Sequence, residues 1–191
     1  MLILISGSSG AGKNTIIDHL MQRNDNIRLL QSCTTRKRRK NEKENAYIYL
    51  SKEEFDEKLK NGEIFENEEI HQNFYGILNS SLQEVLKEAS KNIHYIKDVG
   101  VLGQINLSRE LKKKKIPVLT IFIQVPMAQL IERLKNRGEK NIDLRLSRME
   151  FETGYIDNFD EIVKNVDLEK TLTRIEKIIN KYQRKFYDAK K

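Results

Sequence analysis

A glycine-rich loop near the amino terminus constrains the fold more than any other feature of the sequence. The loop, GSSGAGKN at 7–14, follows the continuous apolar run Leu2–Ile5 and precedes apolar residues at helical spacing, Ile16, Ile17 and Leu20. A short apolar run ahead of glycines is typical of a parallel strand that is buried on both faces. The sequence therefore predicts a buried strand, a tight turn and a helix, as at the start of a parallel α/β sheet.

Three glycines and a lysine in this loop indicate a phosphate-binding turn. The pattern G-x-x-x-x-G-K-[ST] is matched except at its last position, where Asn14 stands. Glycines let backbone N–H groups turn inward around phosphate oxygens, the next helix adds its positive end, and Lys13 would reach the terminal phosphates. A plain strand-to-helix turn with a surface lysine explains one glycine easily and this combination poorly. The residues predicted to bind the phosphates are Gly7, Ser8, Ser9, Gly10, Ala11, Gly12, Lys13, Asn14 and Thr15.

Asn14 replaces the hydroxyl residue that normally coordinates Mg²⁺ in this motif. Mg²⁺ accepts neutral oxygen donors and usually keeps several waters. The Asn14 amide oxygen could therefore bind the metal directly or through a water, or leave the role to Thr15 after a small shift. The sequence leaves these alternatives open.

Strand and helix patterns alternate along the rest of the chain. Further strands are predicted at Ile27–Leu30, Ile93–Ile96, Val118–Val125 and around Ile162 and Val163. Helices are predicted from the capping box of Ser51 with Glu54 to about Gly62, from a second capping box of Ser81 with Glu84, in MAQLIERLKNRG at 127–138, and at Leu168–Phe186. The charge-dense stretch 31–47 shows neither the helical nor the alternating pattern of apolar residues and is interpreted as a functional loop. The alternation predicts a parallel α/β sheet that binds ligands at the carboxyl ends of its strands.

Composition narrows the class of protein. The 191 residues fit one compact domain, and the 35 Lys and Arg against 28 Asp and Glu favour anionic partners, which include nucleotides and nucleic acids. A single cysteine, Cys33, excludes an internal disulfide, and no apolar stretch approaches the roughly 20 residues of a membrane helix. No secretory signal is recognisable. We therefore expect a soluble, cytoplasmic protein without a membrane partner.

Beyond the loop, the chain resembles the guanylate kinase family, which transfers the terminal phosphate of ATP to GMP. The segments that carry the resemblance are SCTTRKRRKNE at 32–42, YIYLSKEEF at 47–55 and GEIFENEEIHQNFYG at 62–76. The TTRxxR element and the Tyr75-Gly76 pair that follows Glu66 are fairly specific for the family. The resemblance implies a P-loop NTPase-like parallel sheet flanked by helices, with ATP and Mg²⁺ as cofactors. It also implies one domain with a core at about 1–31, 79–125 and 160–191, a segment for the nucleoside monophosphate at 32–78, and a lid at 126–159.

The resemblance assigns the phosphate of the acceptor nucleotide to Arg36, Arg39, Tyr47 and Tyr75, with Glu42 orienting the arginines. Guanidinium groups match phosphate oxygens in a bidentate manner, and tyrosine hydroxyls add neutral donors. The alternative interpretation of RKRRK is a solvated charge run or a nucleic-acid patch. We favour the phosphate role for the two arginines of the motif and the solvated role for Lys37, Arg38 and Lys40.

For the guanine base, the resemblance implies contacts from Glu66, Ser32 and Asp98. A carboxylate can accept hydrogen bonds from both N1–H and N2 of guanine. Two further polar contacts that are usual in the family are replaced here by Ile77 and Gly100. Since a lost hydrogen bond to substrate typically costs ~0.5–1.5 kcal/mol, we expect a weakened or altered preference for guanine.

The predicted lid carries arginines that, in the family, reach over the ATP phosphates. They correspond to Arg133, Arg137 and Arg145, and an ungapped alignment would select Arg148 in place of Arg145. Convergent cations suit phosphoryl transfer, which needs positioning and charge stabilisation. With Lys13 and Arg36, these three arginines form the predicted catalytic set, and Asn165 is expected beside the adenine.

Three other functions remain open at this point. A related kinase could act on another small phosphate such as a ribose bisphosphate, which the lost base contacts favour and the intact TTRxxR element opposes. A non-catalytic guanylate-kinase-like module that binds peptides would tend to lose the loop lysine and the lid arginines, which are present here. A nucleic-acid binder is indicated only by the basic charge and lacks interleaved aromatic residues. We therefore expect small nucleotides as partners and no nucleic acid.

Overall fold

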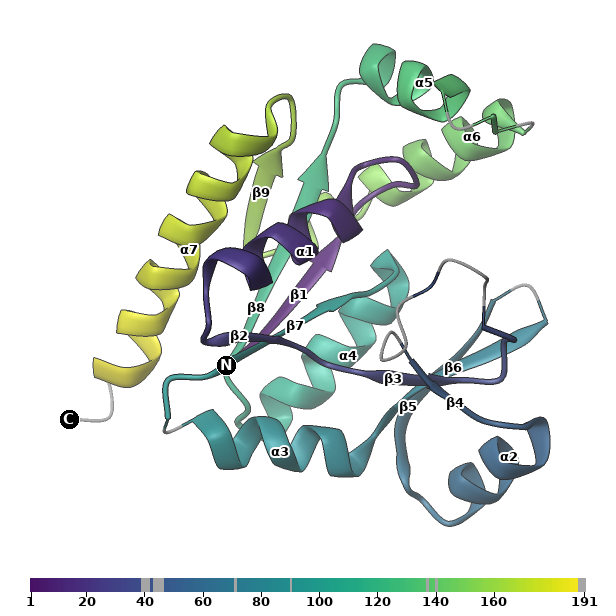
Figure 1. Cartoon of the computed structure of the whole chain (residues 1–191), viewed down its shortest axis with the longest axis vertical. Coiled ribbons are helices and arrows are strands. Elements are labelled where there is room, and N and C mark those ends of the chain that lie inside the picture. Colours follow the sequence, from purple (N-terminus) through teal and green to yellow (C-terminus); the bar gives the residue numbers. More distant parts are fainter. Residues whose placement is uncertain are drawn as a thin grey trace. The chain divides into compact units, whose positions relative to one another are not determined.

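The chain forms two compact units, each with its own sheet (Figure 1). A computed structural model describes residues 1–38, 42, 47–70, 72–89, 91–136, 138–139 and 141–188. The first unit comprises Met1–Arg28 and His94–Lys191, and the second comprises Leu29–Ile93. The second unit contains the segment 32–78, which the sequence assigns to the acceptor, together with one further helix.

The first unit is built on a five-stranded sheet. Its strands, in spatial order, are β2 (Ile27–Leu29), β7 (His94–Asp98), β1 (Leu2–Ser6), β8 (Val118–Gln124) and β9 (Glu161–Lys164). Strand β1 pairs in parallel with β7 and β8, and β8 pairs in parallel with β9. All five residues of β1 are buried, as expected for a strand covered on both faces. The predicted parallel α/β sheet is confirmed.

Helices cover both faces of this sheet: α1 (Lys13–Arg23), α4 (Val101–Lys113) and α7 (Leu168–Asp188) pack against its strands. Helices α5 (Met127–Asn136) and α6 (Ile142–Thr153) pack against each other, and a 3₁₀ turn lies at Ile156–Asn158. Helix α1 follows β1 and leads to β2, whereas α4 leads from β7 to β8 in the opposite direction across the sheet. Right-handed crossovers therefore place α1 and α4 on opposite faces, and α7 packs against α1. None of the helices among the described residues is long and apolar enough to cross a membrane.

The second unit holds a four-stranded mixed sheet that sequence periodicity only partly reveals. Its strands, in spatial order, are β4 (Tyr47–Tyr49), β3 (Ser32–Thr34), β6 (Asn73–Leu78) and β5 (Ile64–Ile70). The interpretation of 31–47 as a loop is wrong at both ends, because β3 lies within it and β4 begins at Tyr47. Three-residue strands are too short to show alternation, and β3 forms because β4 and β6 supply its backbone partners.

Two helices complete this unit, and their predicted starts have different outcomes. The capping box before α2 (Lys52–Lys60) is confirmed: Glu54 N–H donates to Ser51 Oγ at 3.1 Å, and Ser51 N–H donates to Glu54 Oε2 at 2.6 Å. The predicted start at Ser81 is wrong, because α3 (Asn79–Ala89) begins directly after β6. Asn79 anchors that earlier start by donating from its backbone N–H to the Glu63 carbonyl and from Nδ2 to the Gly62 carbonyl.

Buried His94 gives the first unit a predicted acid sensitivity. The ring has no exposed surface, its Nδ1 lies 3.4 Å from the Met1 nitrogen, and its Nε2 lies 3.3 Å from Gln183 Oε1. Burial lowers the pKa of His94 from 6.5 to about 4. The unfolded chain therefore binds a proton at His94 near pH 6.5 that the folded chain resists, so the contribution of His94 to stability is full above pH 6.5 and falls by about 3 kcal/mol as the pH drops towards 4.

Urea denaturation at pH 7, 5.5 and 4.5 measures this effect. The His94→Gln variant is expected to lose less free energy of unfolding between pH 7 and 4.5 than the unsubstituted protein. His19→Gln, at a half-buried position on α1, is the matched control and should keep the full acid dependence. Equal acid losses in the unsubstituted protein and the His94 variant would contradict the prediction.

Candidate active site

The glycine loop lies between the end of β1 and the start of α1, and its backbone requires glycine. Gly7 has φ +145°, and a Cβ atom there would lie 2.4 Å from the Ile123 carbonyl oxygen of β8. Gly12 has φ +88° and is the residue before α1. Few L side chains tolerate positive φ, and a side chain at Gly7 would also clash with the neighbouring strand. The loop thus has the close strand-to-helix path that the sequence predicts.

Lys13, the first residue of α1, folds back over this loop. Its Nζ donates to the Gly7 carbonyl oxygen at 2.6 Å and to the Ser8 carbonyl oxygen at 3.3 Å. The ammonium group therefore lies against the loop, at the end of a helix whose dipole already favours an anion. Asn14 and Thr15 follow it, and both are exposed on the first turn of α1. Lysine, helix terminus and oxygen donors are thus gathered around one turn.

A cavity of about 210 Å³ lies beside the loop, where Arg133 of α5 meets Asn165. Its lining residues are Gly10, Gly12, Thr15, Arg133, Asn165 and Leu168. Arg133 Nη2 donates to the Asn165 carbonyl oxygen at 3.1 Å, and Asn165 Nδ2 donates to the Ala11 carbonyl oxygen at 2.8 Å. Two residues from different segments that the family resemblance assigned to ATP therefore contact each other and border the loop.

Asp98, at the end of β7, lies within the electrostatic reach of Lys13 and of Glu152 on α6. Desolvation raises the pKa of the Asp98 carboxyl, the positive charges of Lys13 and Lys97 oppose that shift, and Glu152 adds to it. Glu152 is itself buried, and its Oε1 accepts from Arg148 Nε at 3.1 Å. Sequence reasoning missed Glu152, whose only signal is its position one helical turn after Arg148.

The remaining lid arginines are tied to acidic neighbours on their own segment. Arg145 Nε donates to Glu139 Oε2 at 3.1 Å, and Arg148 pairs with Glu152 four residues further along the same helix. Arg137 lies outside the described residues. Of the described arginines in the predicted lid, Arg133 is the one that bonds to a residue beside the glycine loop.

One face of the four-stranded sheet in the second unit carries the predicted acceptor residues. Ser32 pairs with Tyr47, Thr34 with Tyr75, and Glu66 with Ile77. Directly paired residues point to the same face, and residues two apart along a strand do so as well. The strands therefore bring Ser32, Tyr47, Glu66, Tyr75 and Ile77 to a common face. The opposite face packs Cys33, Ile48, Phe74 and Leu78 against Phe55 and Ile64 in a hydrophobic core.

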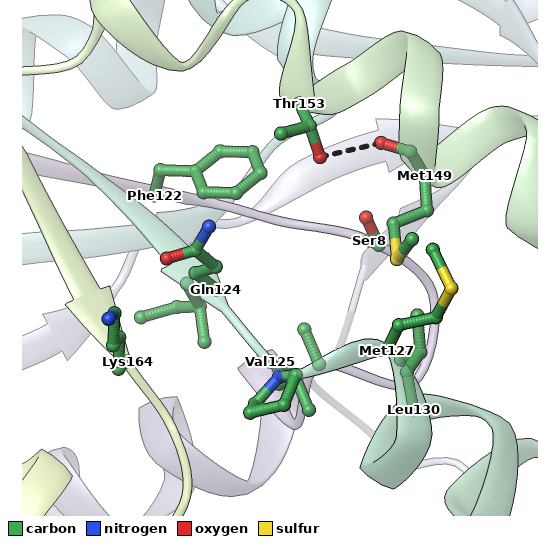
Figure 2. Close-up of a pocket in the computed structure, with 12 residues that line it drawn as sticks. Ser8, Phe122, Gln124, Val125, Met127, Leu130, Met149, Thr153 and Lys164 are labelled. Atoms are coloured by element: carbon green, nitrogen blue, oxygen red, sulfur yellow. Dashed lines mark hydrogen bonds between the residues drawn. The ribbon is translucent and has the colours of Figure 1, made fainter.

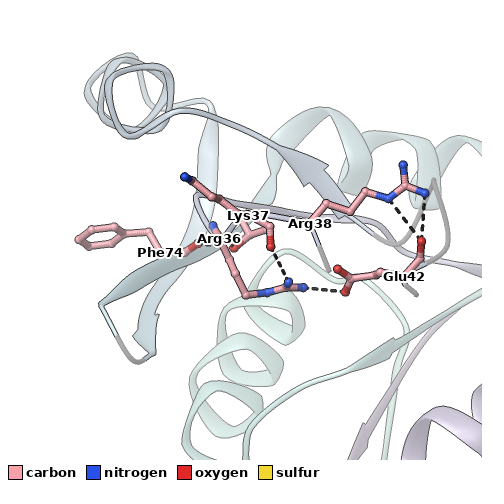
Figure 3. A network of polar contacts seen from close by, with 6 residues as sticks. Arg36, Lys37, Arg38, Glu42 and Phe74 are labelled. Carbon is pink, nitrogen blue, oxygen red and sulfur yellow. Dashed lines mark hydrogen bonds and ion pairs between the residues drawn. The ribbon is translucent and has the colours of Figure 1, made fainter. Parts of the chain in front are cut away.

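Arg36 follows β3 and is held in a fixed arrangement (Figure 3). Its Nη2 donates to Glu42 Oε1 at 2.6 Å, its Nη1 donates to the Lys37 carbonyl oxygen at 2.8 Å, and its guanidinium carbon lies 5.4 Å from the ring centre of Tyr47. The hydrogen bond to Glu42 is the largest of the effects that raise the pKa of Arg36 above its ordinary value. Tyr47 and Tyr75 meet edge to face at 5.9 Å. Arginine and tyrosines thus form one polar cluster.

The neighbouring basic residues lie differently. Arg38 donates from Nε and Nη2 to the Glu42 backbone carbonyl and is exposed, and Lys37 is exposed as well (Figure 3). Arg39 and Lys40 lie outside the described residues. Sequence reasoning missed Tyr49, whose ring centre is 6.1 Å from that of Tyr47 and whose pKa is raised by desolvation and then by Glu42. The alternation in Tyr47-Ile48-Tyr49 was the available signal for its place on this face.

The two positions that depart from the family pattern are both described. Ile77 is buried, with 1% of its surface exposed, and it lies directly opposite Glu66. Gly100 is the residue before α4 and provides no side-chain cap for that helix. The predicted guanine contact Glu66 therefore has an apolar neighbour, at a position where the family pattern has a polar residue.

A second cavity, of about 370 Å³, lies at the carboxyl end of β8 (Figure 2). Met127 of α5 and Met149 of α6 contribute to its walls, with Phe122, Val125 and Leu130, and Ser8 and Ala11 of the loop border it. Thr153 Oγ1 donates to the Met149 carbonyl oxygen at its edge. Among the described residues that line it, only Ser8 and Ala11 have a predicted role in the chemistry.

Comparisons with known proteins point to one family. Residues 1–182 match the family model described as guanylate kinase. The chain is 37% identical over 183 residues to the guanylate kinase of Chlorobium chlorochromatii, with 93% of each chain covered, and 35% identical over 188 residues to that of Mycoplasmoides gallisepticum, with 95% and 93% covered. The crystal structure of guanylate kinase from Anaplasma phagocytophilum is similar with a TM-score of 0.70 and 29% identity, covering 96% of this chain and 86% of that one.

Proposed function

Because the chain belongs to the guanylate kinase family, we propose that it transfers the terminal phosphate of ATP to GMP in the cytoplasm. The observation that supports the proposal is that one chain carries two separate groups of residues, each of a chemistry that suits a phosphate. Lys13 bonded over a glycine loop suits the donor, and Arg36 clustered with Tyr47 and Tyr75 suits the acceptor. A protein that bound a single phosphate group would need only one of them.

Charge and position are sufficient for this reaction. The acceptor phosphate is already a nucleophile at neutral pH, so no general base is required. Lys13 would offset the charge that develops on the transferred phosphoryl group, while Arg36 and Arg39 would hold the acceptor in line. Arg133, Arg137 and Arg145 would add charge over the donor phosphates, and Arg145 would exchange its bond to Glu139 for a phosphate oxygen.

Mg²⁺ is the metal that we propose for the donor half-site, which consists of the glycine loop with Lys13, Asn14 and Thr15. Asn14 provides an amide oxygen and Thr15 a hydroxyl, both exposed on the first turn of α1 beside Lys13. These neutral oxygens fit a cation that is commonly held by one or two protein ligands, by phosphates and by water. When bound, the metal would offset phosphate charge. Asn14 or Thr15 would hold it, directly or through a water.

We assign the adenine of ATP and the guanine of GMP to different groups of residues. The cavity lined by Arg133, Asn165 and Leu168 would take the adenine of ATP. Glu66 would accept hydrogen bonds from guanine, with Ser32 and Asp98 as further contacts. Ile77 beside Glu66 adds no polar partner, so guanine recognition would depend on fewer hydrogen bonds than the family usually provides.

Ile77→Thr tests this assignment of the base contact. The new hydroxyl lies opposite Glu66 and is expected to lower the KM for GMP by about 2- to 10-fold, the equivalent of one neutral hydrogen bond. Since Ile77 is buried, the variant should also unfold at a lower temperature. Ile77→Val is the matched control, because it removes a methyl group and adds no hydroxyl. A KM for GMP that is the same in both variants would show that residue 77 does not face the base.

A substrate panel tests the function itself. Purified protein with MgATP is offered GMP, dGMP, AMP, CMP, UMP and ribose phosphates, and ADP release is recorded. GMP and dGMP are expected to give the highest kcat/KM. Turnover of a ribose bisphosphate alone would favour the related small-phosphate kinase, which the two missing base contacts support. Turnover of none of them would contradict the kinase proposal and favour the non-catalytic module.

A further inference from the structure

Asn165 occupies a more central position than a residue that only borders a base. It follows β9, is buried with 4% of its surface exposed, and bonds to three different parts of the first unit. Its backbone N–H donates to the Gln124 carbonyl at 2.8 Å, its backbone carbonyl accepts from Arg133, and its side-chain Nδ2 donates to the Ala11 carbonyl at 2.8 Å. The side-chain amide is therefore bonded to the glycine loop.

The hydrogen bond to Ala11 fixes the direction of a peptide group in the loop. In a trans peptide the C=O and N–H groups point in opposite directions, so anchoring the Ala11 carbonyl also sets the direction of the Gly12 N–H. That N–H belongs to the set of backbone donors that a glycine loop offers to phosphate oxygens. The orientation of one phosphate donor is thus set by a side chain 153 residues away in the sequence from Gly12.

Packing at Gly12 also indicates that the Asn165 side chain fixes the backbone of the loop. A Cβ atom on Gly12 would lie 2.8 Å from Asn165 Nδ2, so the amide rests against the glycine backbone. Thr171 of α7 lies on the other side, where its Oγ1 is 3.2 Å from Asn165 Oδ1 and 2.6 Å from the Asp167 carbonyl. Because the amide nitrogen must face the Ala11 carbonyl, the carbonyl end of the amide faces Thr171. The side chain is held between the loop and α7 in one orientation.

Asn165 lines the cavity assigned to adenine, but we propose that its side-chain amide is a positioning group for the phosphate loop, which supports the binding of the donor's phosphates and makes no hydrogen bond to the base. The proposal rests on the proposed kinase function and deepens it at the donor half-site. It differs from the expectation of the family resemblance, which places Asn165 beside the adenine. Loss of a side chain that contacts adenine weakens the binding only of ligands that carry a base. Loss of a side chain that orients the loop weakens the binding of every polyphosphate.

The test compares the binding of ATP with the binding of inorganic tripolyphosphate, which has no base, by isothermal titration calorimetry. Asn165→Ala is expected to weaken both by the same factor, about tenfold, which is the upper range for one lost hydrogen bond. Asn180→Ala removes the same side chain from an exposed position on α7 and should leave both affinities unchanged. Circular dichroism at the titration temperature checks that each variant is folded.

Each result decides the proposal. Weaker ATP binding with unchanged tripolyphosphate binding would overturn it in favour of base recognition, and unchanged affinity for both would leave Asn165 with a role in stability alone. If Asn165→Ala fails to fold, Asn165→Ser replaces it, and its affinities for ATP and for tripolyphosphate are measured in the same way. If the unsubstituted protein binds both ligands but does not phosphorylate GMP, the proposed function fails while the inference about Asn165 is still decided by binding.

Discussion

Replacing Lys13 by alanine is expected to lower kcat for GMP phosphorylation by about 10³-fold, the largest effect that we predict for one substitution. The ammonium group lies against the glycine loop through its bonds to the Gly7 and Ser8 carbonyls, where donor phosphates would be enclosed. It would interact most strongly with the charge that develops during transfer, so its loss should reduce kcat more than it raises the KM for ATP. Steady-state kinetics with MgATP and GMP measure both constants.

Lys177→Ala is the matched control for this substitution. Lys177 is exposed on α7 and has no place in the proposed chemistry. Its removal lowers the net charge by the same amount and should leave kcat unchanged. Activity of the Lys13 variant within tenfold of the unsubstituted protein would mean that the loop does not hold the transferred phosphate, and the donor assignment would fail.

Strands β1 and β8 of the first unit could be predicted because each is a nearly continuous apolar run. Leu2–Ile5 and Val118–Ile123 are buried in the structure, and such strands are recognised from hydrophobicity without knowledge of their partners. The glycine loop was predictable for a related reason. Positive φ at Gly10 and Gly12 and the close approach of Gly7 to β8 are demands of the backbone that only glycine meets easily.

The sheet of the second unit was not predictable in the same way. Strands β3 and β4 have three residues each, and their stability comes from pairing with segments far away in the sequence. Charged residues in β5, where Glu66, Glu68 and Glu69 follow one another closely, hide the strand pattern. Propensity is a weak guide where tertiary pairing decides the structure, and the family resemblance found these residues without predicting their strands.

The contacts among the site residues also could not be predicted from the sequence. The family pattern placed Asn165 and Arg133 near ATP, but it gave no reason to expect that one would bond to the other and to Ala11. Likewise, the spacing of Arg145 could not reveal that Glu139, which precedes α6, pairs with it. Such pairs depend on side-chain rotamers and on which charges lie within reach, whereas the pair of Arg148 with Glu152 follows the helical period.

The second large effect, on the KM for GMP, is expected at Arg36. Arg38 in the same charge run RKRRK is the matched control. Arg36→Ala should raise the KM for GMP by about 10- to 100-fold, as expected for the loss of a charge-assisted hydrogen bond of about 1.5–3 kcal/mol. The KM for ATP should change little. Arg38→Ala, two residues along, removes an exposed guanidinium that bonds to the Glu42 backbone and should alter the KM for GMP less than twofold.

The fixed arrangement of Arg36 explains why the two arginines should differ. Its guanidinium is held by the Glu42 carboxylate and by the Lys37 carbonyl and lies over the Tyr47 ring, so little rotamer freedom remains to be lost when a phosphate binds. Arg36→Lys keeps the charge without the bidentate geometry and should fall between the alanine variant and the unsubstituted protein. If Arg36→Ala and Arg38→Ala raise the KM for GMP equally, the run acts as a diffuse basic patch and the acceptor assignment is wrong.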